Sequence, residues 1–156
     1  MTELAAWLAG THLSIWVASH EWVIPTIQSL HIVAIGVALV SAWMVGFRVL
    51  GWVASDQTLA DTNARFRPWL AGSLGVLLVT GALMVAGEPA RELLAFSFWL
   101  KMALVVIGTA LTWWTGATSA KPLTVLTLLV WIGIIFLGRL IAYDHIWGSW
   151  SMSPKA

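Results

Sequence analysis

Apolar residues run along this chain in four long stretches that are separated by short polar segments. Each stretch is long enough, as a helix rising 1.5 Å per residue, to cross the roughly 30 Å hydrocarbon layer of a membrane. The pattern therefore predicts four membrane-spanning helices, at residues 22–48, 67–87, 92–117 and 122–147.

The segments between these stretches have the composition of links and turns. "SDQTLADTNARFRP" is a polar link, "GEPARE" is typical of a tight turn at Pro89, and "TSAKP" is a short turn that closes at Pro122. The predicted fold is an all-α integral membrane four-helix bundle that forms a single domain over residues 1–156.

The first residues are less apolar than the four stretches. Residues 2–19 have the helical spacing of an amphipathic helix lying in the membrane interface. The alternative is a fifth span, which Thr11, His12 and Ser14 disfavour. Glu3 stands where a signal peptide would carry a basic residue, so we expect this segment to belong to the mature protein.

Composition supports the membrane interpretation. The chain is 60% hydrophobic and 10% charged, whereas soluble domains have about 25% charged residues. The lipid bilayer is thus the expected partner, and the scattered cations argue against nucleic acid. The absence of cysteine excludes disulfides, thiolate metal sites and thiol catalysis.

The cations are distributed unevenly between the two ends of the predicted bundle. Four lie in or next to the long link and the last turn, and two lie on the opposite side: Arg48, Arg65, Arg67 and Lys121 against Arg91 and Lys155. By the positive-inside rule the long link is cytoplasmic and both termini are outside, as in a multi-pass protein of a bacterial inner membrane.

Three ionisable residues occupy the interiors of three different predicted spans. His31 and Lys101 each lie about 12 Å below the start of their helix, and Arg139 lies about 10 Å from the end of its helix. They therefore share one layer in the outer third of the membrane. Ionisable residues at this depth usually face the bundle interior and serve a function.

Further polar groups flank this layer, and a purely structural role remains an alternative for two of its members. Gln28 and Tyr143 lie on the faces of His31 and Arg139, slightly nearer the surface, and Ser97 does the same for Lys101. His31 would alternatively bond to a neighbouring backbone group. Arg139 would alternatively extend past Tyr143 to the interface.

The layer holds two permanent cations, and the nearest acidic residues are expected at or near the outer surface: Glu21, Glu88, Glu92 and Asp144. A buried pair of cations needs negative charge. The sequence therefore predicts a bound anion or an anionic cofactor in this layer.

Haem b meets these requirements together, because its iron binds histidine and its two carboxylates bind cations. His31 is the predicted axial ligand, and Lys101 and Arg139 would hold the propionates or a quinone-derived anion.

His145 or His20 would be a second metal ligand, or would bind a second metal such as copper. His20 and His31 are about 16 Å apart along a helix and cannot share one iron. Trp99, Tyr143 and Trp147 would line the pocket, and the alternative for the tryptophans is that they anchor the helix ends in the membrane interface.

The motifs of this chain resemble a family of small bacterial four-helix membrane proteins of unknown function. The resemblance rests on "WVIPTIQSLHIVAIG", "FRPWLAGSLGVLLVTGALM", "FSFWLKMALVVIG" and "GRLIAY", and it covers most of the chain. It implies that the recurring family positions are His31, Arg48, Lys101 and Arg139. The chain departs from the family before Arg48, where Gly46 and Phe47 replace the usual acidic residue.

A helix-one "LH" with a helix-three lysine is also similar, more distantly, to CopD-type copper-resistance proteins, membrane protoporphyrinogen oxidases and cytochrome b561-like proteins. These similarities imply redox, tetrapyrrole or metal chemistry. The leading hypothesis is a haem b protein, acting in electron transfer or as a membrane oxidoreductase near the outer face. The alternatives are a metal or small-ion permease and a structural subunit of a larger complex. Glycines in the second and fourth spans would serve homo-oligomer formation or packing within one bundle.

Overall fold

Four long apolar helices form the body of the protein. The computed structural model describes residues 2–54 and 56–142, with side chains as far as Gly138. The long helices are α3 (Val23–Leu50), α4 (Leu59–Gly87), α6 (Phe96–Thr118) and α7 (Lys121–Ala142). Each has the length and hydropathy of a membrane span. The prediction of an all-α, multi-pass membrane bundle is confirmed.

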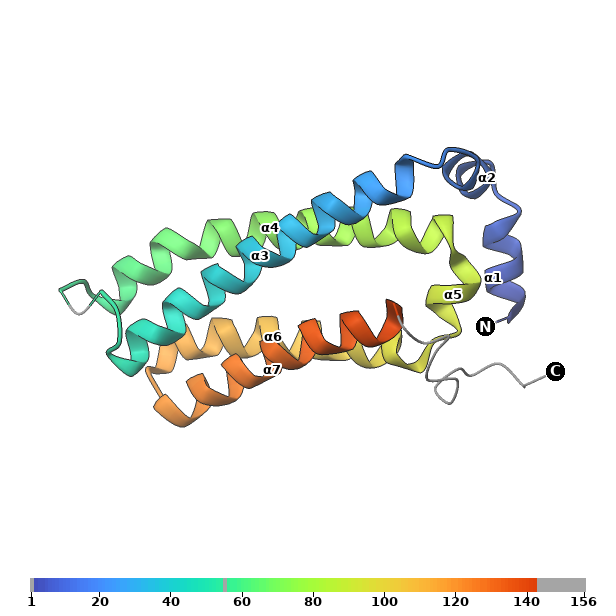
Figure 1. Ribbon diagram of the computed structural model, residues 1–156. Helices are drawn as coiled ribbons and strands as arrows, with labels where there is room; N and C mark the ends of the chain where they lie inside the picture. Colours follow the sequence, from blue (N-terminus) through green and yellow to red (C-terminus); the bar gives the residue numbers. More distant parts are fainter. Residues whose placement is uncertain (1, 55, 143–156) are drawn as a thin grey trace.

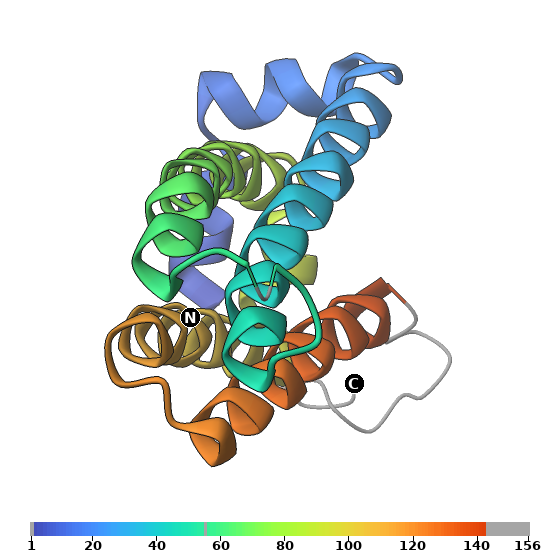
Figure 2. The ribbon, with the colours of Figure 1, turned by 90° about the vertical axis from the view of Figure 1, so that its left-hand side faces the viewer.

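The long helices are arranged as two antiparallel pairs (Figure 1). One pair is α3 with α4, the other is α6 with α7, and Figure 2 shows the two pairs side by side along the bundle axis. The 51–58 link and the 119–120 turn lie at the same end, called here the link end. The short helix α5 (Pro89–Leu93) connects the pairs at the opposite end, called the α5 end.

Residues at the helix ends explain where the elements begin and stop. Thr58 caps α4, with its hydroxyl accepting a hydrogen bond from the Asp61 amide at 3.1 Å. Gly51 ends α3 in the left-handed conformation, with φ of 79°, which favours glycine. Pro89 occupies the first turn of α5, where a missing amide hydrogen has no effect.

Two apolar clusters hold the bundle together, and they are unequally placed. The larger one joins α3, α4 and α7 through Ala38, Ala42, Leu70, Trp131 and Ile134, with Leu104 and Val105 of α6 packed against it. The smaller one contains Val17, Val23 and Ile27, with Leu83 and Met84 packed against it. It lies at the α5 end and joins α3 and α4 to the N-terminal region, not to the second pair.

The N-terminal prediction needs correction. Residues 2–19 form two helices, α1 (Thr2–Ala9) and α2 (His12–Ser19), instead of one. They are separated at Gly10, and Thr11 caps α2 through its hydroxyl. Each helix is about 12 Å long, so the alternative of a fifth span is wrong. Both lie across the α5 end (Figure 1).

Two predicted boundaries also differ. The helix expected from residue 67 begins at Leu59, because the cap at Thr58 starts α4 there, and Pro68 lies inside the helix. The segment expected as a turn at Pro89 and as the beginning of the third span is the separate helix α5, and α6 begins at Phe96. Residues 143–147 of the fourth predicted span lie outside the described residues.

Candidate functional site

The site begins with His31, which is half-buried on α3 and faces α4. Its Nδ1 atom lies 2.7 Å from the hydroxyl oxygen of Thr80. The Thr80 hydroxyl lies 2.7 Å from the carbonyl oxygen of Val76, in the preceding turn of its own helix. A Cβ atom on Gly81 would lie 3.7 Å from His31 Cε1, so α4 passes close to the ring.

Both contacts are hydrogen bonds at the same time in one arrangement of the protons, which uses the Nδ1–H form of the histidine ring. Thr80 has one hydroxyl proton, and the Val76 carbonyl can only accept, so that proton goes to the carbonyl. The Thr80 oxygen then accepts from His31 Nδ1–H. In the neutral ring the other nitrogen, Nε2, is left with a lone pair. Histidines that bind metals commonly have this arrangement: one ring nitrogen donates its proton to a polar partner, and the other nitrogen binds the metal.

Lys101 of α6 is the second member of the site. Its ammonium nitrogen would lie 3.7 Å from a Cβ atom built on Gly138 of α7, so the side chain lies over that glycine. The charge of Lys101 is close enough to act on the His31 ring. Among the described residues Lys101 makes no ion pair or hydrogen bond.

Ser97 lies one turn before Lys101 on the same face of α6. The residue is 4% exposed, and its hydroxyl has no hydrogen-bond partner among the described residues. A buried hydroxyl without a partner is uncommon in folded proteins and usually indicates a bound water or ligand.

Glu92 corrects the charge balance expected from the sequence. It was expected at or near the outer surface, yet it is 8% exposed and lies close to Lys101. Burial raises the pKa of the Glu92 carboxyl, while the positive charges of Lys101 and Arg91 act in the opposite direction. The layer therefore contains an acid, and Lys101 does not depend entirely on a bound anion for negative charge.

The structure thus brings together residues from successive elements at the α5 end: His31 of α3, Thr80 of α4, Glu92 of α5, and Ser97 and Lys101 of α6. We call these five residues the α5-end cluster. Gln28 is half-buried on α3, three residues before His31. Gly138 of α7 is the residue that lies against Lys101, and Arg139 follows it in sequence with a side chain that is not among those described.

Other predicted site residues do not join the α5-end cluster. His20 ends α2, where its Nδ1 lies 2.8 Å from the Trp16 carbonyl and its ring packs on the Trp16 indole. Trp99 donates its indole N–H to the Leu93 carbonyl at 3.1 Å, which fixes the connection between α5 and α6. Tyr143, His145 and Trp147 lie outside the described residues.

The donor set limits the metal chemistry. Within the part of the chain described, no three His, Asp or Glu side chains come close enough together to hold a metal ion. Of the predicted ligands in that part, His31 and His20 each engage Nδ1 and keep Nε2 available, and His31 is the one that lies near Lys101. A single histidine nitrogen can ligate a metal whose other ligands come from a cofactor. A bare metal ion would need several protein side chains around it.

Thr80 and Glu92 were not predicted from the sequence. Thr80 lies 49 residues after His31, and only the rotation of α4 brings its hydroxyl to the ring. Glu92 turns inward because α5 is a separate helix. The one signal for it was the pair of apolar residues after it, Leu93 and Leu94, which would have indicated burial of that segment.

Comparison with known proteins gives no assignment. No protein family, curated protein or solved structure matches this chain. The function must therefore be inferred from the α5-end cluster itself.

Proposed function

We propose that this protein binds haem b at the α5-end cluster and transfers electrons near that face of the membrane. The observation that carries the proposal is the 2.7 Å contact between His31 Nδ1 and the Thr80 hydroxyl, which engages one ring nitrogen and leaves Nε2 of His31 to bind iron. When bound, haem b supplies reversible one-electron exchange at its iron.

The residues present fit such a group in three respects. His31 offers one nitrogen ligand, oriented by Thr80. Lys101 is a cation without an ion pair among the described residues, so it is available to hold a propionate. Among the described residues, no apolar cluster joins the two helix pairs at this end, and polar side chains from both pairs lie there instead. Glu92 would hold or release a proton beside Lys101.

The orientation is part of the proposal. The link end carries Arg48, Arg65, Arg67 and Lys121, and we infer that it faces the cytoplasm of a bacterial inner membrane. Both termini and the α5-end cluster would then lie on the outer side. A quinone in the bilayer or a redox protein outside the cell membrane would be the electron partner.

The test is a visible spectrum of the protein purified in mild detergent from haem-replete cells. We expect a Soret band that shifts on reduction with dithionite, and its loss in His31→Ala. The matched control is His20→Ala, which removes a histidine at the same end whose Nδ1 is held locally by Trp16. That variant should keep the band.

A second variant separates ligation from orientation. Thr80→Val keeps Nε2 but removes the acceptor for Nδ1–H, and loss of such a partner typically weakens metal affinity about 10–100-fold. The band should remain at saturating haem and should be lost more readily on dilution. A colourless wild-type preparation, with His31→Ala unchanged in stability, would contradict the haem proposal.

Glu92 supports one alternative function. A buried carboxyl beside an ammonium group, within a membrane helix bundle, is also the arrangement of a proton or small-ion binding station in a permease. This alternative expects ion or proton flux in liposomes that is abolished by Glu92→Gln, from a protein without a Soret band.

A further inference from the structure

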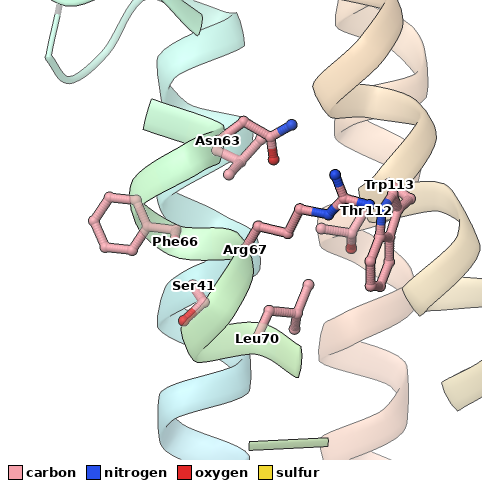
Figure 3. Close-up of a pocket in the computed structure, with 8 residues that line it drawn as sticks. Ser41, Asn63, Phe66, Arg67, Leu70, Thr112 and Trp113 are labelled. Carbon is pink, nitrogen blue, oxygen red and sulfur yellow. The ribbon is translucent and has the colours of Figure 1, made fainter. Parts of the chain in front are cut away.

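A second polar site lies at the link end, far along the bundle from the α5-end cluster. It is a small pocket between α3, α4 and α6 (Figure 3). The polar and aromatic residues that line it are Ser41, Asn63, Phe66, Arg67, Thr112 and Trp113. In Figure 3 Arg67 extends from α4 towards Trp113 of α6, and its guanidinium lies 4.9 Å from the centre of the indole ring.

The free hydrogen-bonding groups of this pocket are mainly donors. Ser41 and Thr112 donate their hydroxyl protons to carbonyl groups of their own helices, each at 2.7 Å. The side chains of Arg67 and Asn63 make no hydrogen bond to any described residue. No acidic side chain is among the described residues that line the pocket. The guanidinium and the Asn63 amide are therefore available to an anion, and the planar guanidinium suits the oxygens of a phosphate.

The backbone is shaped to admit Asn63 at this place. A Cβ atom on Gly116 of α6 would lie 2.9 Å from Asn63 Nδ2 and 3.1 Å from its Oδ1. A larger residue at this position would push the Asn63 amide aside. Asn63 is consequently held beside Arg67 across one turn of α4, on the face towards α6.

The aromatic surroundings of the pocket favour a lipid as the source of the anion. Large indole rings are exposed around the link end, as expected at the level of lipid headgroups: Trp52, Trp69 and Trp114. Arg67 and Trp113, which are also exposed, lie on the same helices within two residues of Trp69 and Trp114. The exposed Arg67 side chain is long enough for its guanidinium to extend from the pocket to a lipid phosphate at that level.

We propose that Arg67 and Asn63 form a binding site for the phosphate group of an anionic phospholipid in the leaflet at the link end. The guanidinium donates to the phosphate oxygens from its position over Trp113, and the Asn63 amide donates from the adjacent turn. The excess of cations at this end attracts the lipid. The site is independent of the haem proposal, because it shares no residue with the α5-end cluster.

The experiment measures phosphatidylglycerol retained by the detergent-purified protein, by native mass spectrometry over a lipid titration, with phosphatidylcholine as the neutral comparison. Arg67→Gln should weaken phosphatidylglycerol binding about tenfold, as expected for loss of a charged hydrogen bond. Arg65→Gln is the matched control, because it removes an equal charge from the same helix outside the pocket. It should change binding less than twofold.

Asn63→Leu provides a second test that leaves every charge in place, and it should weaken binding about threefold to tenfold. Equal losses in Arg65→Gln and Arg67→Gln would overturn the proposal in favour of nonspecific attraction. If millimolar inorganic phosphate displaces phosphatidylglycerol from the wild-type protein, the ligand is a free phosphate and the lipid assignment is wrong.

Discussion

The two halves of α6 differ in whether their polar side chains have hydrogen-bond partners on other helices. In the half towards the link end, Thr112 accepts a hydrogen bond from the Trp131 indole at 3.0 Å, and the Thr115 hydroxyl lies 3.0 Å from that of Thr127. In the half towards the α5 end, Ser97 and Lys101 have no such partner among the described residues. We call the half of α6 with hydrogen-bonded threonines the completed half, and the half with Ser97 and Lys101 the incomplete half.

This difference distinguishes polar residues that hold helices together from polar residues that are available to a ligand. The threonines lie in the closely packed contact between α6 and α7, where a Cβ atom on Gly108 would come within 3.2 Å of Val130. Their hydrogen bonds fix the register of two helices in lipid. The unpaired groups lie where no apolar cluster joins the helix pairs. Buried polar groups without protein partners persist mainly where a ligand or water completes them.

The largest expected effect is in the completed half. Trp131 is 3% exposed and belongs to the main apolar cluster, so Trp131→Ala should lower the free energy of unfolding by about 3–5 kcal/mol. Chemical unfolding in detergent measures this. Trp114→Ala, on the exposed face of α6, is the control and should cost much less. Equal losses would mean that α6 and α7 are not held by this cluster.

Lys101→Met tests the incomplete half. Replacing a buried charge with an apolar side chain of similar length is often neutral or stabilising, so the unliganded protein should gain about 1 kcal/mol in free energy of unfolding. A double-mutant cycle with Glu92→Gln should give a coupling energy of about 0.5–3 kcal/mol between the two residues. A large loss of stability in Lys101→Met would show that Lys101 completes the fold as Trp131 does.

Glu92 predicts a dependence of stability on pH. Because burial raises the pKa of the carboxyl, the folded protein keeps this proton over a range where the unfolded chain has lost it. Stability should therefore fall as pH rises from the ordinary carboxyl pKa through the raised pKa of the folded protein. Glu92→Gln should remove this contribution. Thermal unfolding across that range checks it, and parallel curves for the two proteins would contradict it.

The smallest effect is expected for Thr115→Val. The substitution removes one hydrogen bond between α6 and α7, and such bonds in membrane proteins contribute about 0.6 kcal/mol on average. The change in unfolding free energy should be of that size. Thr118→Val, whose hydroxyl bonds only to its own helix, is the control. A change above about 2 kcal/mol would mean that the threonine contacts act as one cooperative network.

The number of helices and their approximate positions follow from the sequence, because apolar length alone decides whether a helix can span a membrane. Boundaries set by local chemistry do not follow in the same way. The first two turns of α4 are polar, and their helical form depends on the cap at Thr58. The break at Gly10 depends equally on a cap, at Thr11.

The candidate site was predictable in depth but not in detail. Counting residues along two helices places His31 and Lys101 in one layer, because the rise per residue is constant. It does not give the rotation of a helix about its axis, which decides that Thr80 is the partner of His31. Nor does it give the direction in which a five-residue helix turns its acid, which decides the burial of Glu92.

The N-terminal helices connect the surroundings of the α5-end cluster to the membrane itself. α1 packs against α5, which carries Glu92, while α1 and α2 expose Trp7, Ile15 and Trp16 on their other side. Such a helix pair needs protein on one face and a lipid surface on the other. Bilayer thickness and headgroup packing would then help to set how water reaches Glu92. The titration of this carboxyl should consequently differ between a micelle and a bilayer, and its behaviour in the cell is best measured in lipid.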